Sequence, residues 1–335
     1  MKQSNFLLSC ASFIVIIAGM KVASPILIPF LLAAFITILT LPILLFLNKN
    51  GIPKGISVFL IILILLLFGG SISFLLGSSI SGFSSRIPFY TDQITSKANF
   101  ILELISSFGF QIPKSAMNEY FDPGTAIQII GNTISGLRNV LTNMFLIILT
   151  VLFLLMEASS FPSKIKKAFP NSKELFKSIK SFFDGFNRYL IIKTITSFTT
   201  GLFIFIWLYI LDIDFPILWG IIAFMLNFVP NVGSILAAIP AVILALIQFG
   251  IIKALIVVLG FLIVNLGLGG LLEPRFLGKG LGLSPLVVFI SLVFWGWVLG
   301  PIGMLLSVPL TMILKIALEY SPNTKWIAII IGTEK

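Results

Sequence analysis

Long runs without a charged residue constrain what this chain can fold into. Each run holds at least 18 residues, close to the ~20 apolar residues that a helix needs to cross the hydrocarbon core of a bilayer. Only 10% of all residues are charged, against about 25% in a soluble domain. The sequence therefore predicts an all-α, polytopic integral membrane helical bundle. These runs include Val22–Asn48, Gly55–Ser85, Asn139–Met156, Thr194–Leu211, Phe215–Ile252, Ala254–Leu272 and Leu281–Leu314.

Half of the net charge of +10 lies in one stretch. Between Glu157 and Lys193 there are eight Lys or Arg residues against three Asp or Glu residues. Cytoplasmic loops of membrane proteins carry such an excess of positive charge. The charge therefore indicates membrane topology, and we expect no nucleic-acid partner.

The spans and the charges between them divide the chain into segments with assigned sides. In one polar segment, Asp122 and Pro123 predict the start of a helix, as N-cap and first helical residue. The expected segments are N-terminal membrane spans in 1–80, an extracytoplasmic helical segment in 81–138, a membrane span in 139–157, a basic amphipathic cytoplasmic segment in 158–193, a C-terminal membrane transport core in 194–318 and a cytoplasmic tail in 319–335.

Part of the basic segment, Lys173–Leu190, has the pattern of an amphipathic helix. Its apolar face includes Phe182 and Phe183, and its cations lie off that face. Such a helix lies in the membrane interface, where anionic lipids attract its cations. The alternative is that the apolar face packs on the protein's own helices. The residues expected at the interface are Lys173, Lys177, Lys180, Phe182, Phe183 and Arg188.

Several classes of enzyme are excluded by the residues that the chain lacks. There is no histidine and one cysteine, Cys10, which excludes serine–histidine hydrolases and HExxH metalloproteases. No phosphate-binding loop of the form GxxxxGK(S/T) occurs. We therefore expect no enzymatic activity, no metal and no cofactor.

Two charge-free blocks in the C-terminal half each contain a break. The first break is Pro230–Gly233 and the second is Gly300–Gly303, both with the residues of a turn. The arms beside them have 14 to 16 residues and rise about 21–24 Å as helices, less than the ~30 Å hydrocarbon core. Either all arms cross, giving ten spans, or the blocks are two re-entrant hairpins beside six spans. The arm lengths favour the hairpins.

The two blocks also form a weak internal repeat. A shift of 69 residues places Pro216 on Pro285 and Pro240 on Pro309. One span, Ala254–Leu272, separates the blocks and would give them opposite orientations. This is the arrangement of an inverted repeat, in which broken helices meet near the membrane midplane around a substrate site.

The breaks predict a substrate path, because non-helical backbone at membrane depth is tolerated only where protein covers it or water reaches it. Gly233 is expected to allow a left-handed backbone conformation. Interhelical hydrogen bonding is the alternative role for each buried asparagine. The candidate residues are Asn227, Pro230, Asn231, Gly233, Ser234, Asn265, Glu273, Gly300, Pro301 and Gly303.

Three functions compete for such an architecture. The simplest is secondary transport of a small hydrophilic molecule, as an exporter. Cation/proton antiport would require ionisable residues at the midplane, whereas those of this chain lie near the predicted span ends. A non-transporting membrane scaffold has no need for broken helices in charge-free blocks.

Three stretches carry proline and glycine in a distinctive order. They are "SPILIPFLLAAFITILTLPILLFLNKNGIPKG", "NFVPNVGSILAAIPAVILAL" and "LEPRFLGKGLGLSPLVVFISLVFWGWVLGPIGMLLSVPL". These stretches resemble the autoinducer-2 exporter family of bacterial membrane proteins, and the order of elements agrees along nearly the whole chain. The motif residues carried over by position are Asn227, Pro230, Gly233, Pro240, Glu273, Pro274, Gly300, Pro301, Gly303 and Pro309.

The resemblance implies a multi-pass transporter of the bacterial inner membrane. Some members export a small signalling molecule, and others are proposed to exchange cations for protons. A small-molecule or ion substrate and contact with membrane lipid are therefore expected, and the resemblance is compatible with a homo-oligomer. The chain departs from the family pattern at Asn231 and Ser234, where members often have an aromatic residue and a proline.

The assigned sides of the membrane give the first testable prediction. In a Cys10→Ser background, an impermeant thiol reagent added outside the cell should modify Ser96→Cys and leave Ser172→Cys unmodified. The reason is that 81–138 is expected outside and the basic segment inside. Labelling of Ser172→Cys alone would contradict the whole layout.

Overall fold

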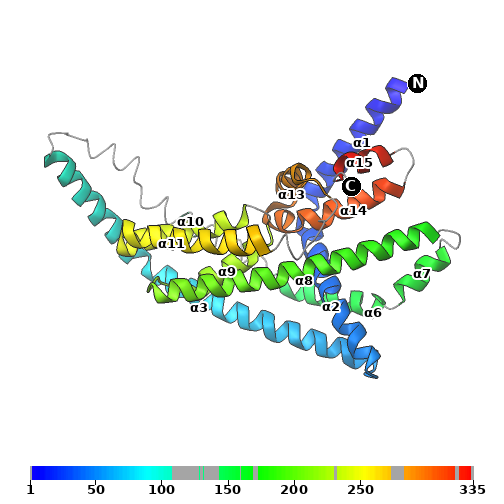
Figure 1. The fold of residues 1–335 in the computed structure, drawn as a ribbon, viewed down its shortest axis with the longest axis horizontal. Coiled ribbons are helices and arrows are strands. Elements are labelled where there is room, and N and C mark those ends of the chain that lie inside the picture. Colours follow the sequence, from blue (N-terminus) through cyan, green and yellow to red (C-terminus); the bar gives the residue numbers. More distant parts are fainter. Residues whose placement is uncertain are drawn as a thin grey trace. The chain divides into compact units, whose positions relative to one another are not determined.

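Every regular element that the computed structural model describes is a helix (Figure 1). Five of these helices are long and apolar enough to cross a membrane, which confirms the predicted all-α multi-pass architecture. Among the predicted residues, Asp122, Pro123, Pro230, Asn231, Glu273 and Pro274 lie outside the described part of the chain. The described residues are 2–107, 128, 131, 143–158, 160–168, 173–229, 232–272, 283–320 and 324–332.

The chain forms two compact units, each built from separate segments of the sequence. The first unit comprises Met1–Gly69, Thr142–Thr194 and Glu273–Lys335, and the second comprises Gly70–Leu141 and Ile195–Leu272. The segments predicted from polarity and charge concern sides of the membrane, so they remain predictions.

In the first unit, α2 packs along α6, while α13 packs against α1, α2 and α14. Ser284 begins α13 as its N-cap, because its Oγ accepts a hydrogen bond of 3.3 Å from the backbone N–H of Val287. The helices of this unit are α1 (Lys2–Val22), α2 (Ser24–Lys49), the first part of α3 (Lys54–Ser107), α6 (Met144–Ala158), α7 (Phe161–Ala168), the first part of α8 (Lys173–Ile210), α13 (Pro285–Leu305), α14 (Ser307–Tyr320) and α15 (Lys325–Ile331).

The second unit has its own apolar core. Trp219 and Tyr90 are its largest fully buried side chains, and leucine, isoleucine and alanine residues surround them. The core holds the C-terminal parts of α3 and α8 together with α9 (Pro216–Leu226), α10 (Gly233–Phe249) and α11 (Ile251–Val264). The π-helix η1 (Asn265–Leu272) follows α11 directly.

Two helices run across boundaries between the predicted segments. Helix α3 continues through Ser81 with Pro88 inside it, and α8 continues from the basic segment through Lys193 into the following apolar run. The sequence changes polarity at both places. A change of polarity marks a change in the surroundings of a helix, whereas the backbone hydrogen bonds can continue across it. The continuous helices therefore leave the predicted sides of the membrane as predictions.

The apolar face of the basic segment packs on the protein at its C-terminal end. Phe186, Tyr189 and Leu190 are buried against Leu283, Val308 and Met312. This is the arrangement expected from the packing alternative. Phe183 is half-buried and Arg188 is exposed, while the side chains of Lys173, Lys177, Lys180 and Phe182 lie outside the described part. Contact between these cations and lipid remains a prediction.

This packing gives a second prediction. Leu190→Ala should destabilise the protein by about 2–5 kcal/mol, because it leaves a cavity in a closed cluster. Ile191→Ala is the matched control, because the Ile191 side chain is next along the helix and 44% exposed. Thermal unfolding in detergent checks the difference, and equal loss in both variants would contradict this packing.

Candidate functional site

The first predicted break is present in the second unit. Helix α9 ends at Leu226 and α10 begins at Gly233, and the two helices pack on each other. The 11 residues of α9 rise only about 16 Å, about half of the hydrocarbon core. The short arm supports the re-entrant topology over the topology with ten full spans.

Gly233 is required for a reason other than the expected one. It does not have a positive φ, so the expected left-handed conformation was wrong. A Cβ at this position would lie 1.8 Å from the carbonyl oxygen of Leu226. The end of the first arm therefore passes directly against the start of the second, and any side chain would force the arms apart.

A buried polar pair lies beside this break. Asn227 is 9% exposed, and its Nδ2 donates a hydrogen bond of 3.0 Å to Oγ of Ser197 on α8, which is fully buried. This is the interhelical bond expected as the alternative for a buried asparagine. Ser197 lies in a row of hydroxyl residues and was not among the predicted site residues. Its neighbour Thr199 instead donates to Ile195 O in its own helix.

Close contact between α8 and α9 positions this pair. A Cβ on Gly201 would lie 2.7 Å from Gly220 O, and a Cβ on Gly220 would lie 2.9 Å from Gly201 O. The two backbones can approach this closely only because both residues are glycine. The available signal in the sequence was a glycine, Gly201 or Gly220, within each of two successive apolar runs. The sequence analysis did not use it.

The second predicted break is present in the first unit. Gly300 has φ 67° and ψ −155°, which interrupts α13 just before Pro301. The chain then folds back, so that α14 meets the part of α13 before the break. Trp295 Nε1 in α13 donates a hydrogen bond of 3.0 Å to Thr311 Oγ1 in α14. A Cβ on Gly303 would lie 2.0 Å from Trp295 O. The arms are thus in contact at a glycine, as they are at Gly233.

The correspondence between the two blocks is partial. Pro216 and Pro285 both occupy the first turn of an arm. Pro240, however, lies inside α10, whereas Pro309 is the third residue of α14. The breaks belong to different units, and the path that both were expected to line remains a prediction.

Asn265 marks a change of helix type. It is half-buried at the point where α11 ends and the π-helix Asn265–Leu272 begins. Stretches of π-helix are rare and occur often at functional sites. Ser234, another candidate, is half-buried in the first turn of α10. The structure therefore places Asn265 at a change of helix type and Ser234 at the start of a helix, both in the second unit.

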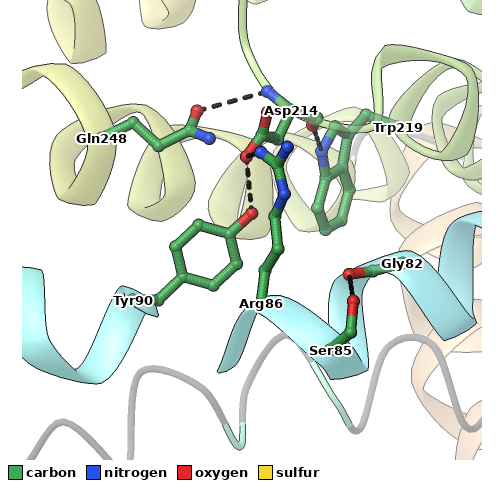
Figure 2. A network of polar contacts seen from close by, with 7 residues as sticks. All are labelled: Gly82, Ser85, Arg86, Tyr90, Asp214, Trp219 and Gln248. Atoms are coloured by element: carbon green, nitrogen blue, oxygen red, sulfur yellow. Dashed lines mark hydrogen bonds and ion pairs between the residues drawn. The ribbon is translucent and has the colours of Figure 1, made fainter. Parts of the chain in front are cut away.

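A polar network centred on Asp214 was not predicted (Figure 2). The Asp214 carboxylate pairs with Arg86 and accepts a hydrogen bond of 2.7 Å from Tyr90 Oη. Neither Arg86 nor Asp214 was among the predicted site residues. The signal was that Arg86 ends one charge-free run while Asp214 precedes another, so each charge had few possible partners.

Comparison with known proteins agrees with this architecture. Residues 10–323 match the family described as AI-2E family transporter. The chain is 38% identical to the AI-2 transport protein TqsA of Escherichia coli strain K12, over 95% of this chain and 93% of that protein. It is 37% identical to a putative transport protein of Haemophilus influenzae, over 97% and 95% of the two chains.

A more distant relative covers the chain equally well. The putative transport protein YhhT of Escherichia coli strain K12 is 31% identical over 98% of this chain and 94% of that protein. All three relatives are named as transport proteins, and the five long apolar helices place the chain in the membrane. The chain is a multi-pass protein of the inner membrane and belongs to the AI-2E family of transporters.

Proposed function

We propose that this protein is a secondary transporter that exports a small hydrophilic molecule across the inner membrane. The observation that carries the proposal is the break between α9 and α10, which lies in a 38-residue charge-free block beside the buried pair Asn227–Ser197. A bilayer offers no partner to backbone groups exposed at such a break. A water-accessible path beside the break would supply those partners.

The residues around the break suit a polar, uncharged solute. The amide of Asn227 carries two N–H donors and one acceptor oxygen, and one of these donors is bound to the hydroxyl of Ser197 at 3.0 Å. The substrate path that we propose contains Asn227, Pro230, Asn231, Gly233 and Ser234 in the second unit, and Gly300, Pro301 and Gly303 in the first. Asn265 and Glu273 are further candidates for its lining.

The name of the 38% identical relative makes AI-2 the first solute to test. The solute should accumulate inside cells that lack this protein and appear in the medium when the protein is restored. A broader comparison of metabolites inside and outside the same cells would identify another substrate. Equal distribution of every small solute with and without the protein would contradict export and favour a non-transporting scaffold.

Cation/proton antiport is a second candidate, favoured by one observation. Lys193 in α8 is only 5% exposed, and buried ionisable residues in membrane helices often take part in ion pathways. Vesicles that contain the protein would then release or take up protons when a monovalent cation is added. If antiport is the function, Lys193→Gln should abolish this proton response. If export is the function, Lys193→Gln should leave solute export intact.

The polar pair gives a third prediction. Asn227→Leu should lower export by about tenfold, the equivalent of one lost hydrogen bond to a solute. It should also destabilise the fold by about 1–3 kcal/mol, because the buried Ser197 hydroxyl loses its partner. Ser197→Ala is the control, since it removes only the partner hydroxyl. The amount of folded protein in variant and parent is measured by size-exclusion chromatography. If export falls only in proportion to the amount of folded protein, Asn227 has only a packing role.

A further inference from the structure

The connection between α8 and α9 has a strained backbone. Asp212 and Phe215 have φ of 57° and 59°, in the left-handed region that residues with a side chain rarely adopt. Such residues persist only where surrounding contacts over-determine them, and they are concentrated in parts of proteins that switch. These two residues bracket Asp214, so the contacts of Asp214 hold the strained connection in place.

Asp214 is held by residues from three helices (Figure 2). From α3, Arg86 and Tyr90 both contact its carboxylate. Its backbone N–H donates to Oε1 of Gln248 on α10 at 3.2 Å. Its carbonyl accepts a hydrogen bond of 3.0 Å from Nε1 of Trp219 on α9.

These contacts differ in how easily they can be broken. Tyr90 and Trp219 are fully buried in the core of the second unit. The Arg86 side chain is 55% exposed and that of Asp214 is 21% exposed. An exposed ion pair contributes little stability because water competes for both charges. The ion pair can therefore open while the buried side chains keep α3 and α9 attached.

Helix α9 is fixed at three points along its length. The Asp214 contacts hold its base, the Gly201–Gly220 crossing lies near its middle, and the Asn227–Ser197 bond holds its far end. A helix of 11 residues moves as a rigid rod. A change at the base is therefore transmitted across the glycine crossing to the end that carries Asn227.

We propose that the Arg86–Asp214 ion pair is a latch on α9, which opens during transport and lets the Asn227 end of the helix change position. Arg86 and Asp214 are then positioning residues, which act through α9 and do not contact the solute. This inference rests on the proposed transport function. The strained connection supplies the tendency to relax when the latch opens, and Tyr90 and Trp219 limit how far α9 moves.

The test uses full-length protein in lipid vesicles, with Cys10→Ser and a reporter at Val232→Cys beside the break. The rate at which a small hydrophilic thiol reagent modifies the reporter is measured. Arg86→Gln and Asp214→Asn should each raise this rate about 1.5- to 5-fold, the range that corresponds to losing an exposed ion pair. The double variant should react no faster than the faster single variant, and Arg86→Asp with Asp214→Arg should return the rate toward that of the parent.

A second reporter distinguishes a latch from general loosening. Val257 is fully buried on α11 of the same unit, so Val257→Cys should react at the same slow rate in all variants. An unchanged rate at Val232→Cys would overturn the proposal. An equal rise at both reporters would also overturn it, because the ion pair would then only stabilise the fold.

Cross-linking separates this proposal from the proposed function. A short thiol cross-linker that joins Arg86→Cys to Asp214→Cys should stop export of the solute, while each single variant treated in the same way should still export it. Normal export by the cross-linked protein would overturn the latch and leave the transport function in place. If the parent protein exports nothing, the transport function fails, and the reporter rates still decide whether the latch exists.

Discussion

The need to satisfy backbone hydrogen bonds in hydrocarbon is the constraint on which the rest of this structure depends. A continuous helix satisfies it without help, and most of the described chain is continuous helix. The two breaks are the exceptions. At each break a glycine, Gly233 or Gly303, lets the following arm pass against a carbonyl group of the preceding arm. The arms therefore shield part of each break, and we propose that water is the partner of its remaining polar groups.

In the second unit, the short helix α9 before the break is held by two kinds of contact. Apolar contacts around Trp219 and Tyr90 hold α9 and α3 together. The polar contacts lie at the two ends of α9, at Asp214 and at Asn227. Apolar packing in a membrane protein carries no directional preference, whereas hydrogen bonds and ion pairs do. The position of α9 along its axis is thus fixed by the polar groups at its ends together with the close Gly201–Gly220 crossing near its middle.

The sequence predicted the positions of the breaks and the helical class, because both follow from local chemistry. Pro230–Gly233 and Gly300–Gly303 combine proline and glycine within apolar runs, and few other structures accommodate that pattern. The continuity of α3 and α8 could not be predicted in the same way. Polarity changes at Ser81 and Lys193, but polarity reports the surroundings of a helix and not its hydrogen bonds.

The contacts of the candidate site were hardest to predict, because they join residues far apart in the chain. Asn227 was identified from its position near a break, but its partner Ser197 lies 30 residues away. The Arg86–Asp214 pair spans 128 residues, and no local pattern connects them. The need for glycine at position 233 also depends on the distance between the two arms, and only the folded chain determines that distance.

The central claim is that both breaks lie inside the membrane where water reaches them. Thiol labelling of Asn231→Cys and Ile302→Cys, each in a Cys10→Ser background, tests it most directly. The account predicts slow modification of both by small hydrophilic reagents, slower still in the presence of a transported solute, and no modification by bulky impermeant reagents. Fast modification by bulky reagents, at Asn231→Cys only from inside and at Ile302→Cys only from outside, would show surface loops between full crossings and contradict the account.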